Sequence, residues 1–517
     1  MPRVLLVDDD AEQLEVRRML FEQAGHETYT AEGAGAALEV FDRAAPQLVV
    51  TDLRLPGTED GLELIRALRR RSSGVKIVVL SGWTSELEQM PEAKLVDAIM
   101  GKPTRSRCLL ALAAKLSLWI FAMLSSAAVP MAAAELAADL EISSSRMERV
   151  EILPGDGPRQ YVMAYPGYCK QHVQVFFSVP QPAAGRIALR HSAAVQAHVL
   201  RVRQVTPEDP YYLPLANAPI LFARADTIES MSDAPVLAYC ERLGGSGAPL
   251  LQYTIIFTNE DGGTSTRGLM ARWGRSTDIE YVYRAYLRPD GSLLRATIQG
   301  RGHKEIAFQG RREGGHPLLA PVTLNNMVSG EVASRVRFQL APQLVDLTAA
   351  SRELVMDRNW FLYRVAAQEL EREGKLRPFG VVDGEKISNP RNYLYLEASI
   401  ANQGSALAAL VRLHGENRLR SSHLGRAGFA IERSGWIRTA VELPPGTAPG
   451  QVTSIGFECL VVAPSKNDPL PDSGTCHIEQ VSKAFFLGAD YRPGESFFRI
   501  QNPVDIPAGE IVEFPVR

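Results

Sequence analysis

Strand-like runs and amphipathic stretches alternate along the first 116 residues of the chain. The runs typical of strands occupy residues 3–7, 26–30, 47–51, 76–80 and 97–100. Between them, apolar residues recur at helical spacing in residues 11–24, 34–44 and 61–70. This alternation predicts an α/β doubly wound domain with a five-stranded parallel sheet. In such sheets the functional site lies outside the carboxyl ends of the strands.

Polar side chains follow four of these strands at that edge. They are Asp8, Asp9 and Asp10 after the first strand, Asp52 after the third, Ser81 after the fourth and Lys102 after the fifth. Clustered carboxylates repel one another, so a cation must offset them, and Mg²⁺ prefers oxygen ligands. A carboxylate beside Mg²⁺ can attack phosphorus, while the metal, a lysine and a hydroxyl offset the phosphoryl charge. Asp10 suits a different role, because Asp is favoured as the N-cap of a helix.

Five motifs make this pattern specific. The segments VLLVDDD, TDLRLPG, GLEL, VVLSG and GKP occur in this order and at family spacing. On these motifs, residues 1–116 resemble the receiver domain of bacterial response regulators. The resemblance implies that Asp52 is the phospho-acceptor, loaded by a histidine kinase or a phosphotransfer protein. It implies a phospho-accepting signalling domain, not an enzyme.

The resemblance also implies roles for the other residues at this edge. Asp8 and Asp9 would form the acidic pocket, and Asp9, Asp52 and the backbone carbonyl of Arg54 would bind Mg²⁺ directly. Ser81 would be the switch hydroxyl. Lys102 would contact the phosphoryl group, and the peptide bond before Pro103 would be cis.

Two departures from the family pattern affect the expected switch. The loop LPGTEDGLEL after Asp52 is one residue longer than the commonest form. Ile99 stands three residues before Lys102, where many relatives carry Tyr or Phe. An isoleucine cannot make the aromatic rotamer change of those relatives, so we expect a different signalling face or a weak switch.

A segment without charge follows the expected last helix, residues 104–116. Residues 117–134 are apolar and then rich in small residues, ending in Ala132-Ala133-Ala134. Basic residues precede this segment, namely Lys102, Arg105, Arg107 and Lys115. The order is typical of a secretory signal, and the length also suits a marginal transmembrane helix or membrane anchor at 116–134.

The basic flank places the receiver in the cytoplasm of a bacterial cell and residues after 135 outside it. Three interpretations stay open for this junction: an uncleaved anchor, a cleaved signal, or two joined genes. A long buried helix is the plainer alternative.

Residues 135–345 and 346–517 are predicted to be two β-rich, sandwich-like units. Strands are expected at 173–179, 251–258, 279–287, 293–298, 393–400 and 454–463, with a hairpin at Asp290-Gly291. One clear helix is expected at 359–376, ended by Gly374. No known family is recognised in this part. A net charge of −3 and the lack of a basic helix-turn-helix segment argue against nucleic acid as a partner.

Several residues of this β-rich part could carry chemistry or packing. Cys169, Cys240, Cys459 and Cys476 suit either two disulfides or four buried thiols. Asp278 and Glu280 share a strand face and suit acid/base work on a glycan, or a solvated surface. Tyr393, Tyr395 and Glu397 suit a sugar-stacking strip, or core packing.

Two functions are therefore weighed for the whole chain. The first is a phosphorelay receiver joined to an extracytoplasmic β-rich region of unknown role. The alternative is an exported β-rich protein that binds a small ligand or glycan, or hydrolyses a glycan, with the receiver present through gene fusion.

Overall fold

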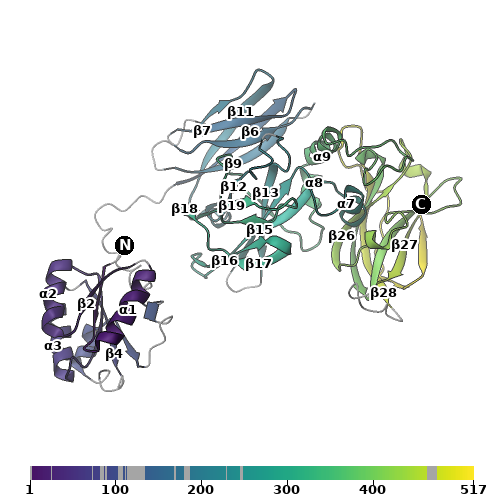
Figure 1. The fold of residues 1–517 in the computed structure, drawn as a ribbon. Helices are drawn as coiled ribbons and strands as arrows, with labels where there is room; N and C mark the ends of the chain where they lie inside the picture. The colour runs from purple at the N-terminus through teal and green to yellow at the C-terminus, as the bar shows by residue number, and fades with distance from the viewer. Residues whose placement is uncertain are drawn as a thin grey trace. The chain divides into compact units, whose positions relative to one another are not determined.

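The chain divides into two compact units, residues 1–132 and 133–517. The structure is a computed structural model. It describes residues 3–24, 26–72, 74–81, 87, 90–102, 109–110, 112, 134–155, 157–167, 170–179, 187–228, 230–244, 249–462 and 474–516. Figure 1 shows helices packed on a sheet in the first unit and mostly strands in the second.

The N-terminal unit has a five-stranded parallel sheet in the order β2-β1-β3-β4-β5. Its strands are β1 (Arg3–Val7), β2 (Glu27–Ala31), β3 (Leu48–Asp52), β4 (Lys76–Ser81) and β5 (Ala98–Gly101). Its helices are α1 (Ala11–Gln23), α2 (Ala34–Ala44), α3 (Thr58–Arg71) and the 3₁₀ turn η1 (Pro91–Leu95). The predicted doubly wound fold is confirmed.

Both faces of this sheet are covered, which explains why its inner strands β1, β3 and β4 consist mainly of buried apolar residues. On one face of the sheet, Leu14 and Phe21 of α1 pack together with Leu109. On the other face, α2 packs through Phe41 and α3 packs through Ile65. Leu109, Leu110 and Leu112 are the described residues of the expected helix 104–116. The expected cis bond at Pro103 lies outside the described residues.

Gly61 fixes how closely α3 approaches the loop after β3. A Cβ atom at this position would stand 1.9 Å from the carbonyl oxygen of Leu53. Because backbone cannot give way as a flexible side chain does, only glycine permits this approach. The longer loop after Asp52 is thus held against the first turn of α3, where Asp60 accepts a hydrogen bond from the Gly57 amide at 3.0 Å.

The first part of the C-terminal unit contains four sheets around one large core. One sheet joins β10 (Ile187–Arg190), β7 (Glu148–Pro154) and β8 (Gln160–Ala164), and a second joins β11 (Val195–Val205), β6 (Ala134–Ser144) and β9 (Gln171–Val179). A third joins β18 (Arg312–Glu313), β19 (His316–Pro321), β12 (Ile220–Phe222) and β21 (Arg337–Phe338), with β20 (Val328–Ser329) on β19. The fourth joins β17 (Lys304–Ala307), β16 (Leu293–Gly300), β15 (Asp278–Leu287), β14 (Leu250–Phe257), β13 (Pro235–Leu243) and β22 (Gln343–Val345).

The last part of the unit has two four-stranded sheets that share a second core. One joins β26 (Gly435–Glu442), β23 (Tyr393–Gln403), β28 (Thr475–Phe486) and β29 (Val504–Pro507). The other joins β25 (Arg420–Ser421), β24 (Ser405–Leu413), β27 (Val452–Val461) and β30 (Ile511–Pro515). A disulfide between Cys459 and Cys476 connects β27 to β28 inside this core.

The predicted β-rich character of this unit is confirmed, and the boundary expected near residue 345 stays a prediction. The hairpin at Asp290-Gly291 joins β15 to β16, with Gly291 at a positive φ of 81°. The expected helix is α9 (Phe361–Arg372), and Gly374 follows its cap with φ of 64°. Among the described residues of this unit, three shorter α-helices were not predicted, namely α6 (Tyr212–Ala216), α7 (Thr266–Trp273) and α8 (Leu354–Arg358).

The charge-free segment 117–134 lies outside the described residues except for Ala134, which begins β6. Among the helices that the structure describes, none combines the length and the apolar character needed to cross a membrane.

Candidate functional site

The ends of four parallel strands bring the predicted polar residues to one edge of the N-terminal sheet. β1 ends directly before Asp8, and β3 ends at Asp52. β4 ends at Ser81, whose register partner is Gly101 of β5, so Lys102 follows one residue later. Parallel strands that end together place these side chains side by side.

Asp8 is the buried member of the acidic group, with 1% of its surface exposed. Its Oδ1 accepts a hydrogen bond from the Asp10 amide at 3.0 Å, and its Oδ2 accepts one from the Arg17 guanidinium. Burial raises the pKa of Asp8, but these hydrogen bonds and the positive charges of Arg17 and Lys102 outweigh it, so the net pKa is lowered. Asp8 is therefore held as a carboxylate.

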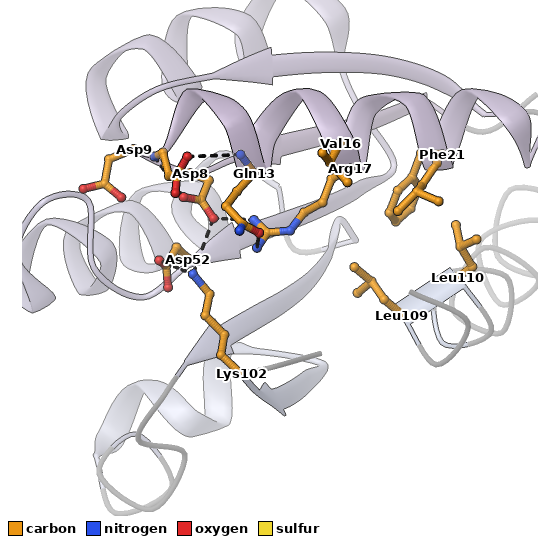
Figure 2. Close-up of a pocket in the computed structure, with 12 residues that line it drawn as sticks. Asp8, Asp9, Gln13, Val16, Arg17, Phe21, Asp52, Lys102, Leu109 and Leu110 are labelled. Carbon is orange, nitrogen blue, oxygen red and sulfur yellow. Dashed lines mark hydrogen bonds and ion pairs between the residues drawn. The ribbon is translucent and has the colours of Figure 1, made fainter. Parts of the chain in front are cut away.

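Asp52 lies next to Asp8 and is half-buried. The Leu53 amide donates to its Oδ1 at 2.7 Å, and the Lys102 ammonium donates to its Oδ2 at 2.6 Å. The same ammonium lies 3.5 Å from Oδ2 of Asp8. Figure 2 shows Lys102 extending from just beyond the end of β5 toward Asp52, so that one ammonium group contacts two carboxylates.

Three carboxylates of this edge can act together on a metal ion. Asp8, Asp9 and Asp52 each offer a ligand oxygen, and these atoms lie within 4.8 Å of one another. A set of carboxylate oxygens fits a hard cation such as Mg²⁺. Arg54, whose carbonyl was expected as a further ligand, lies in the loop after β3 with its side chain exposed.

Ser81 lies at the end of β4 and Asp10 at the start of α1, as the sequence predicts. Ser81 is buried at the end of β4, and its carbonyl oxygen accepts a hydrogen bond from the Lys102 amide at 2.8 Å. Asp10 caps α1, since its carboxylate accepts hydrogen bonds from the amides of Glu12 and Gln13. The N-cap prediction is therefore confirmed, and Asp10 has a structural role beside the acidic pair.

A pocket of about 680 Å³ opens at the acidic group and extends along α1. Its polar end holds Asp8, Asp9 and Asp52, and its apolar end is lined by residues such as Phe21 and Leu109. Figure 2 shows both ends, with Arg17 between them.

Arg17 is the site residue that sequence reasoning missed. It ion-pairs with Asp8 and its side chain is only 13% exposed. The helical period would have indicated its position, because residue 17 is three after buried Leu14 and four before buried Phe21. A charged residue on that inward stripe needs a buried partner.

The candidate residues of the C-terminal unit are mostly buried. Asp278 is 2% exposed and receives a hydrogen bond from Asn326 at 3.0 Å, so it is not part of a solvated strand face. Glu280 receives one from Gln299 at 2.7 Å. Tyr393 and Tyr395 are buried in the core, which leaves no stacking strip at the surface.

The cysteines of this unit have different states. Cys459 and Cys476 form a disulfide, Cys240 is a buried free thiol, and Cys169 lies outside the described residues. One of the two disulfides considered from the sequence is thus present among the described residues.

Comparison with known proteins gives matches to the N-terminal unit. Residues 4–113 match the model of the response regulator receiver domain. The chain is 27% identical over 100 residues to sporulation initiation phosphotransferase F of Bacillus subtilis, covering 19% of this chain and 77% of that protein. It is 33% identical over 112 residues to the sensory transduction protein RegX3 of Mycobacterium tuberculosis, covering 22% of this chain but only 48% of that protein.

Solved structures match over the same part of the chain. One is the response regulator protein TrrA from Thermotoga maritima, solved in complex with Mg(2+)-BeF. It is 28% identical, with a TM-score of 0.21, and the match covers 22% of this chain and 99% of that one.

Proposed function

We propose that the response regulator receiver domain formed by residues 4–113 accepts a phosphoryl group on Asp52 in a Mg²⁺-dependent reaction. The donor is a phosphohistidine of a histidine kinase or a phosphotransfer protein. The domain acts as a phospho-accepting element of a two-component system, and Asp8, Asp9, Arg54, Ser81 and Lys102 assist the acceptor.

The position of Lys102 is the observation that supports this proposal most directly. Its ammonium contacts Asp52 at 2.6 Å, at the same edge where three carboxylates converge within 4.8 Å. A structural ion pair needs one acid and one base. Here three acids stand with two cations, Lys102 and Arg17, and this excess of negative charge suits a site that gains positive charge from a metal and negative charge from a phosphoryl group.

The chain's own groups hold the acceptor for attack. The Leu53 amide and the Lys102 ammonium bind the two oxygens of Asp52 and so fix the plane of its carboxylate. An Asp52 oxygen forms a bond to phosphorus while the bond from phosphorus to the donor's histidine nitrogen breaks, giving an acyl phosphate. Mg²⁺ held by Asp8, Asp9, Asp52 and the Arg54 carbonyl would offset the charge of the phosphoryl oxygens.

Phosphorylation of the full chain by a small phosphoryl donor tests this proposal. Asp52→Asn should abolish incorporation of an alkali-labile phosphoryl group, and chelation of Mg²⁺ should do the same to the unaltered chain. Asp42→Asn is the matched control, because Asp42 is an exposed aspartate of α2 paired with Arg71. Incorporation into Asp52→Asn at the unaltered rate would refute the assignment.

We also propose that residues 135–517 lie outside the cytoplasm while the receiver lies inside it. The Cys459–Cys476 disulfide supports this, because such bonds persist in oxidising compartments and are rare in the cytosol. The segment 116–134 would then be the signal or anchor. Thiol alkylation of the denatured chain from its own host, before and after reduction, tests it, because both cysteines are buried in the folded chain. Reactive Cys459 and Cys476 without prior reduction would contradict it.

A further inference from the structure

Two adjacent arginines of α1 point in different directions. Arg18 faces solvent and pairs with Glu15 and Glu22 on its own helix. Arg17 turns inward and donates to Oδ2 of Asp8, whose side chain is 1% exposed. Figure 2 shows its guanidinium lying in the pocket beside Asp8. The second arginine of the pair is thus a surface residue and the first belongs to the acidic group.

Arg17 uses an atom that a metal ion also needs. Oδ2 of Asp8 already faces the Arg17 guanidinium and, at 3.5 Å, the Lys102 ammonium, while Oδ1 accepts the Asp10 amide. A cation that binds Asp8 must therefore share or replace the arginine's contact. The positive charges of Arg17 and Lys102 also repel an incoming Mg²⁺. Solvent screens the charge of Arg17 weakly, because its side chain is only 13% exposed.

The pocket has space for the Arg17 side chain to move into when a metal ion replaces its contact with Asp8. The space of about 680 Å³ continues past Arg17 toward Phe21 and Leu109. Oε1 of Gln13, one turn earlier on α1, already lies 3.5 Å from Nη2 of Arg17. An arginine stem can swing along an apolar wall while its head finds a new polar partner.

We propose that Arg17 is a built-in counter-ion of the acidic pocket, which neutralises Asp8 when no metal is bound and competes with Mg²⁺ for it. This rests on the proposed Mg²⁺ site. The consequence is regulatory: the receiver needs a higher Mg²⁺ concentration to become competent than the same pocket without Arg17, and it stays ordered when Mg²⁺ is absent.

The test is the Mg²⁺ dissociation constant of the unphosphorylated full chain, measured by calorimetry at fixed ionic strength and mildly alkaline pH. Arg17→Met keeps the stem but removes the charge, and it should lower the dissociation constant about tenfold. Arg17→Lys keeps the charge and should stay within about twofold of the unaltered chain. Arg18→Met is the matched control and should have no effect, because Arg18 does not contact the pocket.

Thermal unfolding gives a second readout that does not depend on activity. Without Mg²⁺, Arg17→Met should unfold at a lower temperature, because Asp8 loses its partner, and saturating Mg²⁺ should restore more stability to it than to the unaltered chain. If Arg17→Met does not fold even with Mg²⁺, Arg17→Gln provides the same comparison with a neutral polar side chain.

Different results would contradict the role of Arg17 and the proposed function. An unchanged or higher dissociation constant in Arg17→Met, with normal Mg²⁺ binding and phosphorylation of the unaltered chain, overturns the role of Arg17 alone. A chain that neither binds Mg²⁺ nor becomes phosphorylated overturns the proposed function, and the role of Arg17 with it.

Discussion

The Nζ atom of Lys102 lies 2.6 Å from Oδ2 of Asp52, although the two residues are 50 positions apart in the chain. The contact forms because β3 ends at Asp52 and β5 ends at Gly101, at the same edge of one parallel sheet. Under the proposed function, this lysine would offset the charge of Asp52 before a phosphoryl group arrives and would then bind that group.

Replacing Lys102 should therefore slow phosphorylation without unfolding the domain. In Lys102→Ala, the ammonium that faces both Asp52 and Asp8 is lost, and we expect the rate of phosphoryl transfer from a small donor to fall about 100-fold. Single-turnover incorporation measures it. Lys94→Ala, an exposed lysine in η1, should keep the unaltered rate. Equal rates for both variants would exclude a direct role of Lys102.

Gly61 is predicted to be irreplaceable for a reason separate from the chemistry. Gly61→Ala puts a methyl group 1.9 Å from the Leu53 carbonyl oxygen, so α3 must move away from the loop that follows Asp52. We expect a loss of about 2 to 4 kcal/mol in the free energy of unfolding of the receiver. Denaturant unfolding followed by circular dichroism measures it.

Gly35→Ala is the matched control for this substitution. Gly35 is inside α2, and a Cβ there meets nothing within 4 Å. Because alanine favours the helix, the free energy of unfolding of the receiver should rise by about 0.5 to 1 kcal/mol in this variant. A similar loss in both variants would mean that the contact with Leu53 does not explain the effect.

Much of the N-terminal unit could be predicted because its strands and helices follow from local patterns and its motifs resemble a known family. Buried parallel strands are continuous apolar runs, and the acids and the lysine stand directly at the strand ends. Arg17 was missed because only apolar residues were used to define the helical stripe. Its partner, Asp8, is nine positions away in the loop after β1.

The C-terminal unit was less predictable because its decisive contacts join distant segments. Alternating strands and the Asp290-Gly291 turn were found, since both follow from neighbouring residues. The pairing of Cys459 with Cys476 was one of several that four cysteines allow, and sequence spacing does not choose among them.

A buried ion network ties α8 to one sheet of this unit, the one formed by β26, β23, β28 and β29. Arg438 of β26 has no exposed surface, and its guanidinium makes hydrogen bonds of 2.7 Å to both carboxylate oxygens of Asp357 and to Glu397. Burial raises the pKa of Asp357, but Arg438 and Lys483 outweigh it and the pKa is lowered. Asp357 is therefore held as a carboxylate that depends on Arg438.

Removal of Arg438 should destabilise the C-terminal unit strongly. Arg438→Met leaves Asp357 and Glu397 with Lys483 as their remaining ion-pair partner. We therefore expect the free energy of unfolding of this unit to fall by about 3 to 5 kcal/mol. Denaturant unfolding followed by tryptophan fluorescence measures it. Arg412→Met breaks a solvent-accessible pair with Glu513 and should destabilise the unit much less, because solvent screens such a pair. Equal losses would show that burial does not decide the effect.

Asp233 should make the stability of the C-terminal unit fall as the pH rises. Burial, with the nearby charge of Asp261, raises the pKa of Asp233 to about 9, against the opposing effect of Arg224. An unfolded aspartate has a pKa of about 3.9. Below the unfolded pKa both states hold the proton and the stabilisation is complete. Between about pH 4 and 9 the folded state keeps a proton that the unfolded state has released, so the stabilisation is progressively lost.

Asp233→Asn removes this dependence, because the amide does not titrate. Asn also suits the positive φ of 48° at this position, so the fold should be kept. The free energy of unfolding, measured between about pH 5 and 8, should fall more steeply in the unaltered chain, by up to about 1.4 kcal/mol per pH unit. Asp383→Asn, at an exposed position, should keep the steeper slope. If Asp233→Asn also keeps it, Asp233 is ionised in the folded protein, and the charge of Arg224 at 3.2 Å outweighs burial.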